Sequence, residues 1–165
     1  MKLPPYRLQP VLDKRQKVKE AAERALGDAQ KALEVEKKKE QDLADALEQI
    51  KRKKESTKQE FSQKMRKENL AVEEILRHKN YLKSLDFEIE NAKEKLEEQK
   101  LQVQKAEEFL KEKRQELLAA TSEFQAIEKH KEKWAQALKK EMEEKEQKEQ
   151  EEIGNVLYVQ RKQRG

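Results

Sequence analysis

Residues 75–110 read ILRHKNYLKSLDFEIENAKEKLEEQKLQVQKAEEFL, with an apolar residue at every seventh position. Continued to residue 138, this series has nine apolar residues at ten positions, and Lys131 is the exception. A second series lies three residues further along, from position 78 to Trp134, and six of its nine positions are apolar. Such spacing, sustained over about nine heptads, predicts a coiled-coil helix. The two series together are called the heptad stripe.

The first half of the chain has the same pattern with more interruptions. Its apolar stripe positions are Leu12, Ala22, Leu26, Ala29, Leu33, Leu43, Leu47, Ile50 and Phe61. Polar residues interrupt the stripe at Arg15, Lys19, Glu36, Glu40 and Lys54. Alanine at a stripe position lets two helices approach closely, and a polar residue there can fix their register. The first half therefore offers a second helix that could pair with the first.

The composition favours long helices over a globular core. Hydrophobic residues make up 34% of the 165 residues and charged residues 45%, and there are three glycines and three prolines. So little apolar material cannot fill a thick core, whereas the abundant Ala, Glu, Lys, Leu, Gln and Arg are strong helix formers. The sequence contains no cysteine and no run of about 18 apolar residues that could span a membrane. The N-terminal MKLPPYRLQP lacks an apolar signal core, so we expect a cytoplasmic protein.

The two halves carry opposite net charge. Residues 1–68 hold 19 basic and 13 acidic side chains, and residues 69–154 hold 17 basic and 22 acidic ones. This difference favours pairing of the halves with each other. We therefore predict an all-α fold in which two long helices form an antiparallel coiled-coil hairpin, a single elongated domain over residues 1–165. One continuous helix of about 140 residues is the alternative.

Signals at the helix ends give the expected bounds. Pro10 suits a first helical turn, where its missing N–H is not needed, so we expect a helix over residues 9–66. Gly154 predicts the end of a second helix over residues 72–153, followed by a tail over residues 154–165. Asn69 supports a turn within residues 66–72. No glycine or proline lies between Gly27 and Gly154 to mark the turn more clearly.

The register of this hairpin predicts the surroundings of the single tryptophan. With a turn near residue 69, facing residues have numbers that add up to about 138, so Trp134 lies beside Pro4, Pro5, Tyr6 and Leu8. The ring then either packs on this segment and closes the open end of the hairpin, or stays partly exposed as an anchor for a partner. The glutamate-rich residues 141–152 are expected to extend beyond the first helix, which suggests a partner for that end.

The sequence offers no chemistry beyond binding. His78 and His130 are the only histidines, and the hairpin places them at opposite ends, so we expect no metal site and no cofactor. His78 is interpreted as a polar stripe residue that fixes register. A two-helix rod has no deep pocket and the chain has no glycine-rich phosphate loop, so we expect no enzymatic activity. The lysine runs at residues 37–39 and 51–54 lie beside glutamates without aromatic neighbours, which favours solvated faces over nucleic-acid binding.

Both ends of the chain carry recognisable motifs. YRLQPVLDKRQKVKEAAERAL has the pattern aromatic-x-Leu-x-x-Val-Leu-x-x-Arg followed by an alanine-rich helix, and HKEKWAQALKKEMEEKEQKEQEEIG leads from His-Lys-Glu-x-Trp into a Glu/Lys/Gln-rich helix. These motifs and the two-helix organisation resemble the FliJ/YscO family of type III secretion proteins over essentially the whole chain. The apolar residues 156–159 favour the injectisome branch, which is YscO-like, over the flagellar branch.

The resemblance implies a non-enzymatic central stalk similar to the coiled coil of the γ subunit in rotary ATP synthases. Its implied partners are the hexameric secretion ATPase, an export gate protein and export chaperones, on the cytoplasmic side of the inner-membrane secretion apparatus and without membrane insertion. The open end, residues 6–26 with 127–160, would enter the ATPase ring, and the turn end, residues 55–85, would face the gate. The expected ring contacts are Tyr6, Leu8, Val11, Leu12, Arg15, Trp134, Glu151 and Glu152.

A generic scaffold or tether is the other function that the sequence allows. The same stripes could pair two copies of the chain into a homodimer instead of closing one chain into a hairpin. The oligomeric state in solution separates these two possibilities.

Overall fold

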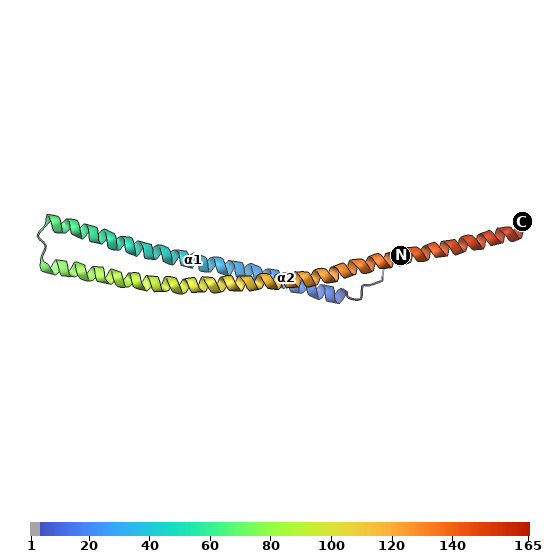
Figure 1. The fold of residues 1–165 in the computed structure, drawn as a ribbon, viewed down its shortest axis with the longest axis horizontal. Helices are drawn as coiled ribbons and strands as arrows, with labels where there is room; N and C mark the ends of the chain where they lie inside the picture. The colour runs from blue at the N-terminus through green and yellow to red at the C-terminus, as the bar shows by residue number, and fades with distance from the viewer. Residues whose placement is uncertain (1–3) are drawn as a thin grey trace. The chain divides into compact units, whose positions relative to one another are not determined.

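The computed structural model describes residues 4–165 and contains two long helices, α1 (Gln9–Lys67) and α2 (Val72–Arg164), joined by residues 68–71 (Figure 1). No strand occurs among these residues. The prediction of an all-α helical hairpin is confirmed. The chain divides into two packed units that each contain part of both helices: residues 4–23 with 115–165, and residues 24–114. The prediction that residues 1–165 form a single domain remains a prediction.

Charged residues explain where the helices meet the connecting loop. The last turn of α1 contains Lys64, Arg66 and Lys67, and the first turn of α2 contains Glu73 and Glu74. Cations at a helix C-terminus and anions at an N-terminus interact favourably with the exposed backbone dipoles. The loop therefore lies at residues 68–71, within the turn expected from the sequence.

The predicted end of the second helix is wrong. Helix α2 continues through Gly154 to Arg164, so residues 154–164 are not a separate tail. Gly154 does not have the positive φ angle that commonly ends a helix. A glycine inside a helix costs only about 1 kcal/mol relative to alanine, and the helix formers around it tolerate that cost. The last turn contains Arg161, Lys162 and Arg164, which suit a helix C-terminus.

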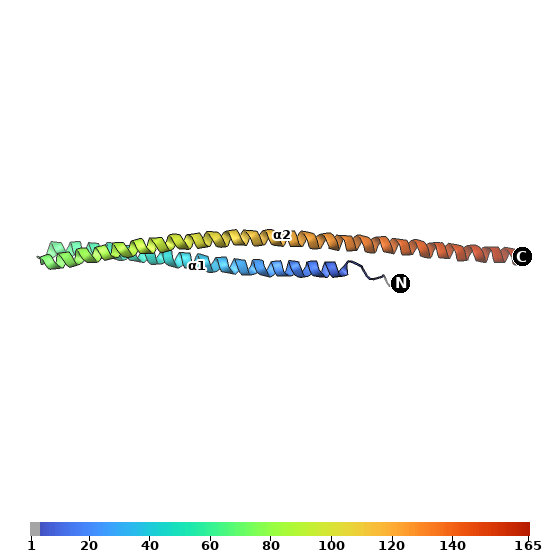
Figure 2. The same cartoon turned by 90° about the horizontal axis from the view of Figure 1, so that it is seen from below.

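The heptad stripes form the contact between α1 and α2 in each unit. In the unit of residues 24–114, both views show the helices side by side (Figures 1 and 2), and a core cluster joins Ala29 and Leu33 of α1 to Val103 and Leu110 of α2. Leu85 is the most deeply buried side chain described, with 0% exposure. Every stripe position predicted above is buried or half-buried, including the polar ones. Burial of a Leu or Ile side chain contributes roughly 1.5–3 kcal/mol, so the stripes supply most of the stability.

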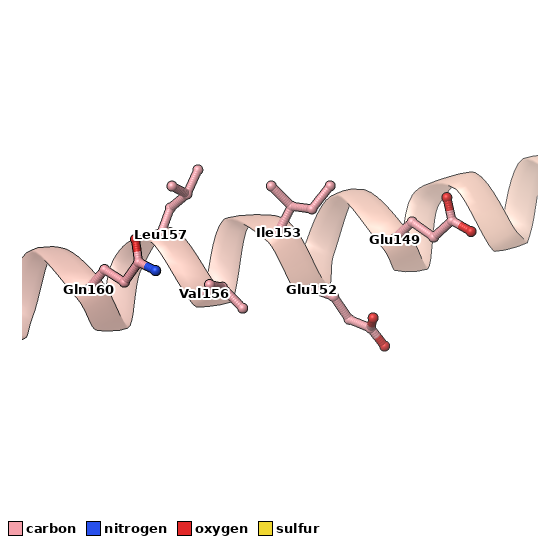
Figure 3. Close-up of a pocket in the computed structure, with 6 residues that line it drawn as sticks. All are labelled: Glu149, Glu152, Ile153, Val156, Leu157 and Gln160. Atoms are coloured by element: carbon pink, nitrogen blue, oxygen red, sulfur yellow. The ribbon is translucent and has the colours of Figure 1, made fainter.

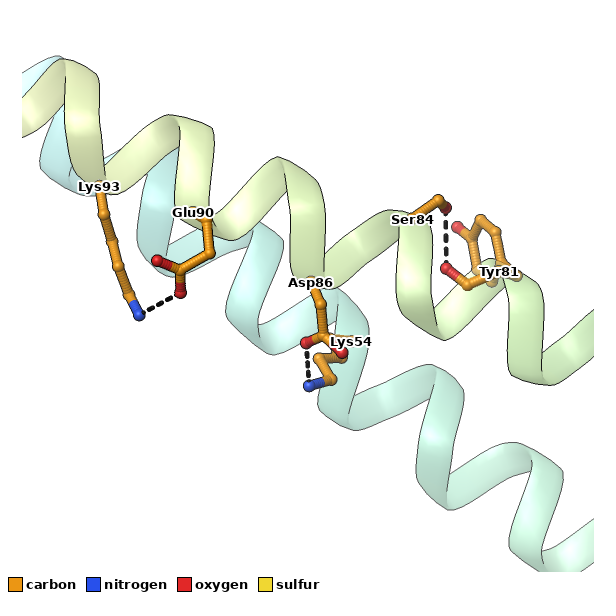
Figure 4. Close-up of polar contacts among 6 residues, drawn as sticks. All are labelled: Lys54, Tyr81, Ser84, Asp86, Glu90 and Lys93. Carbon is orange, nitrogen blue, oxygen red and sulfur yellow. Dashed lines mark hydrogen bonds and ion pairs between the residues drawn. The ribbon is translucent and has the colours of Figure 1, made fainter.

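Ion pairs between the helices follow the predicted charge difference. Arg15, Lys37 and Lys54 of α1 pair with Glu123, Glu107 and Asp86 of α2, respectively. Figure 4 shows the pair closest to the loop, Lys54 with Asp86. In all three pairs the cation comes from α1 and the carboxylate from α2. Since these side chains are largely exposed, each pair contributes about 0–1 kcal/mol and mainly favours the antiparallel register.

Two polar stripe positions face partners across the helix pair. The Gln99 side-chain amide donates hydrogen bonds to the Glu36 backbone carbonyl, at 3.1 Å, and to the Glu36 carboxylate. Hydrogen bonds from Lys39 and Gln99 hold the pKa of the Glu36 carboxyl below its ordinary value. Near the loop, His78 stacks on Phe61 with ring centroids 3.6 Å apart and planes inclined by 12°.

Candidate partner-binding end

The end of the hairpin that carries the N-terminus holds an aromatic cluster. The Tyr6 and Trp134 ring centroids are 5.1 Å apart, and the Tyr6 hydroxyl forms a hydrogen bond with Nδ1 of His130 at 2.6 Å. Tyr6 is 8% exposed and Trp134 is half-buried. This is the contact that the register predicted, and it supports the structural interpretation of the tryptophan.

The N-terminal segment reaches Trp134 because it does not continue α1 as a helix. Pro4 and Pro5 lack the N–H groups of a helical backbone and keep the segment extended. A turn then follows, in which the Gln9 N–H donates to the Tyr6 carbonyl at 3.0 Å. The segment closes the open end and leaves an open hollow on its surface. The hollow is lined by Pro4, Pro5, Tyr6, Arg7, Leu8, His130, Trp134 and Leu138.

The expected contact residues near the start of the chain fall into two groups according to their exposure. Leu8 and Val11 are 38% and 39% exposed and are available to a partner. Leu12 is 8% exposed, because it occupies a stripe position, and Tyr6 is buried to the same extent. Arg15 forms its ion pair with Glu123, and its side chain remains 42% exposed. Tyr6 and Leu12 therefore pack in the interior of this end of the hairpin.

Glu151 and Glu152 lie far from the aromatic cluster. They are 17 positions or more beyond Trp134 on α2, which corresponds to about 25 Å of helix. Both are exposed, and the Glu151 carboxylate accepts a hydrogen bond from Gln147 at 3.4 Å. The structure therefore does not gather the expected contact residues into one site. Leu8, Val11 and Trp134 lie at the open end, and the two glutamates lie on the part of α2 beyond it.

The same part of α2 carries apolar residues that were not among the expected contacts. Ile153, Val156 and Leu157 are 55–60% exposed, and Figure 3 shows them beside Glu149, Glu152 and Gln160 along the helix. Their spacing of three and four residues is a helical signal that is present in the sequence. It was missed because Gly154 was interpreted as the helix end.

The described surface is dominated by charged side chains. Within them, no group of three or more His, Cys, Asp or Glu side chains could hold a metal ion. None of the helices in the described part is apolar enough over sufficient length to cross a membrane. The hydrogen bond between Lys145 and Glu141, and then the attraction of their charges, lowers the pKa of Glu141 and raises that of Lys145, so both groups stay charged on this surface.

Comparison with known proteins identifies the family. The model of the YscO-like protein family matches residues 3–164. The chain belongs to the YscO-like family. A solved structure of a proposed YscO homolog, CT670 from Chlamydia trachomatis, is similar to this YscO-like chain with a TM-score of 0.81 and 26% sequence identity. The match covers 99% of this chain and 100% of that one. No curated protein matches the sequence.

Membership of the YscO-like family assigns the hairpin to type III secretion. The family match extends over the whole of α2, including the residues beyond the aromatic cluster. The part of the YscO-like chain that extends past the paired helices is therefore inside the region shared with the family.

Proposed function

We propose that this YscO-like protein is the non-enzymatic central stalk of a type III secretion ATPase complex. Its open end occupies the pore of the hexameric ATPase, and its turn end faces an export gate protein. Its exposed helix faces bind export chaperones. The complex works on the cytoplasmic side of the inner-membrane secretion apparatus.

The observation that carries this proposal is the exposed continuation of α2. From residue 143 to residue 164, α2 is helical and every residue is exposed. A single helix is about 10–12 Å wide with its side chains, which is narrow enough for the pore of a ring-shaped hexamer. Its surface is mostly charged between residues 141 and 152, and charged contacts favour fast, reversible association over permanent binding.

Stimulation of the cognate secretion ATPase by the purified protein tests the proposal. Val11 and Leu12 offer a matched pair of neighbouring positions, because Val11 is exposed and Leu12 is buried in the stripe. We expect Val11→Asp to reduce stimulation without changing the melting temperature, since it alters only the surface. Leu12→Asp should reduce both, because it buries a charge between the helices.

Absence of stimulation, together with no co-migration of the protein with ATPase hexamers, would refute the stalk role. Equal stimulation by wild-type protein and Val11→Asp would instead show that this face of α1 does not contact the ATPase. The homodimeric scaffold gains no support from the fold. Its stripes would have to be free, and each is covered by the other helix of the same chain.

A further inference from the structure

The part of α2 after Met142 has no partner within the described chain. Residues 143–164 are all exposed, whereas every heptad-stripe residue from Ile75 to Leu138 is at least half-buried. The stripe itself ends after Leu138, because its next positions are Glu141, Lys145, Lys148 and Glu152. Long helices without a covered apolar face are only marginally stable in water, so this segment is expected to gain stability from a partner surface.

One face of this segment has apolar residues at its centre and opposite charges at its ends. The face repeats at helical spacing and comprises Glu146, Glu149, Ile153, Val156, Leu157, Gln160 and Arg164. Figure 3 shows its middle part, where Ile153 and Leu157 lie one turn apart and Val156 lies beside them. Val156 lies five helical turns beyond Leu138, so the face follows the direction of the heptad stripe past the part of α2 that α1 covers. The name C-terminal face is used below for these seven residues.

We propose that, when the protein is not inserted in the ATPase pore, the C-terminal face is covered by the C-terminal face of a second copy of this chain, in antiparallel orientation. With the two-fold axis near residue 155, Ile153 meets Leu157 of the second copy, and Glu146 meets its Arg164. Glu149 then lies opposite Gln160, which can donate a hydrogen bond to a carboxylate. Within the described residues neither Glu146 nor Arg164 has an ion-pair partner, so both are free for this contact.

The charged residues of the C-terminal face favour a second copy as its partner and an antiparallel orientation of the two copies. A parallel pair would place Glu146 against Glu146 and Arg164 against Arg164, and like charges repel. An antiparallel pair is isologous, since each copy supplies the same face and both ion pairs form at once. The heptad stripes stay inside each hairpin, so this dimer differs from one that exchanges helices. Because each copy buries only three apolar side chains of this face, we expect a weak dimer with a dissociation constant on the order of tens of micromolar.

Charge reversal in the full-length protein tests the pairing by sedimentation equilibrium over a concentration range that spans the expected dissociation constant. Glu146→Arg and Arg164→Glu should each weaken the dimer by about tenfold, because each places like charges together. An equimolar mixture of the two variants should dimerise as well as wild type, since the two reversed positions then face each other. The doubly reversed protein should also recover. Weakening by each single variant together with recovery in the doubly reversed protein requires an antiparallel pair, because in a parallel pair neither single change adds a like-charge contact.

A cysteine cross-link gives an independent readout, because the chain has no cysteine of its own. Val156→Cys lies close to the two-fold axis and should form a disulfide-linked dimer on mild oxidation. Asn155→Cys, at the same level but on the other side of the helix, is the matched control and should not cross-link at the same concentration. The proposal is wrong if the wild-type protein stays monomeric throughout, or if the mixture dimerises no better than each single variant. Sedimentation of monomeric protein with phosphatidylcholine–phosphatidylglycerol vesicles would also overturn it, by assigning the face to a membrane.

Discussion

Replacement of His78 by leucine should stabilise the hairpin. His78 occupies a heptad-stripe position and stacks on Phe61 near the loop. Its Nε2 atom is buried and has no hydrogen-bond partner in the part of the chain that the structure describes. An unsatisfied buried polar atom costs about 1–3 kcal/mol, because its interaction with water is lost and not replaced. Leucine fills a similar volume without this cost.

The expected gain follows from two opposing effects. His78→Leu removes the desolvation cost of about 1–3 kcal/mol but also loses the ring stacking on Phe61, which contributes about 0.5–1.5 kcal/mol. The remaining stabilisation is about 1 kcal/mol. For a chain of 165 residues this corresponds to a rise in melting temperature of about 2–4 °C. Circular dichroism at 222 nm during thermal and urea unfolding measures both quantities.

The second histidine provides the control. His130 forms a hydrogen bond with the Tyr6 hydroxyl and is exposed, so His130→Leu removes a satisfied contact. We expect this variant to lose about 0.5–1.5 kcal/mol, opposite in sign to His78→Leu. Any destabilisation by His78→Leu would refute the argument. It would mean that the stacked imidazole contributes more than its unsatisfied nitrogen costs.

Three further predictions concern burial, charge and helix continuity. Leu85→Ala should lower the urea midpoint by an amount equivalent to about 2–4 kcal/mol, since Leu85 is fully buried, whereas Leu101→Ala, at a position 56% exposed, should change it little. The pKa of the Glu36 carboxyl is lowered from 4.5 in the folded protein, so the stabilisation that the charged carboxylate contributes is present above that pH and is lost as the pH falls through the folded-state pKa. The difference in melting temperature between wild type and Glu36→Gln should therefore shrink on acidification. Glu34→Gln is the control and should show no such change. Gly154→Ala should slow amide hydrogen exchange in residues 150–160 by a factor equivalent to about 1 kcal/mol, because alanine favours the helix more than glycine does and the added methyl group meets nothing within 4 Å. No change in exchange would indicate that the helix ends before residue 154.

The hairpin could be predicted from sequence because one periodic signal specifies both burial and register. Positions as polar as Lys19 and Lys54 become half-buried because the heptad spacing places them between the helices. The same register brings Tyr6 to Trp134, although 128 positions separate them. Local charge then helps to place the loop, since Lys67 ends α1 and Glu73 lies in the first turn of α2.

The remaining features depend on information that periodicity does not carry. A single glycine is compatible with a helix end or a helix interior, and only the helix formers and the basic residues after Gly154 favour the interior. The contact between Gln99 and Glu36 depends on side-chain geometry, because many polar pairs at stripe positions would look equivalent in the sequence. The Phe61–His78 stack leaves one nitrogen unsatisfied, which no spacing rule predicts.

The burial pattern also changes how the expected partner contacts should be tested. Tyr6 and Leu12 are among the least exposed side chains of the protein, so substitutions there alter the hairpin before they alter any interface. A loss of partner binding after such a substitution carries no information about contact, because a loosened open end would have the same effect. Val11 lies next to Leu12 on the same turn and is exposed, so a change at Val11 acts on the surface alone. A comparison of partner binding by variants at Val11 and at Leu12 therefore decides whether the first turns of α1 contact a partner or only hold Trp134 and the N-terminal segment in place.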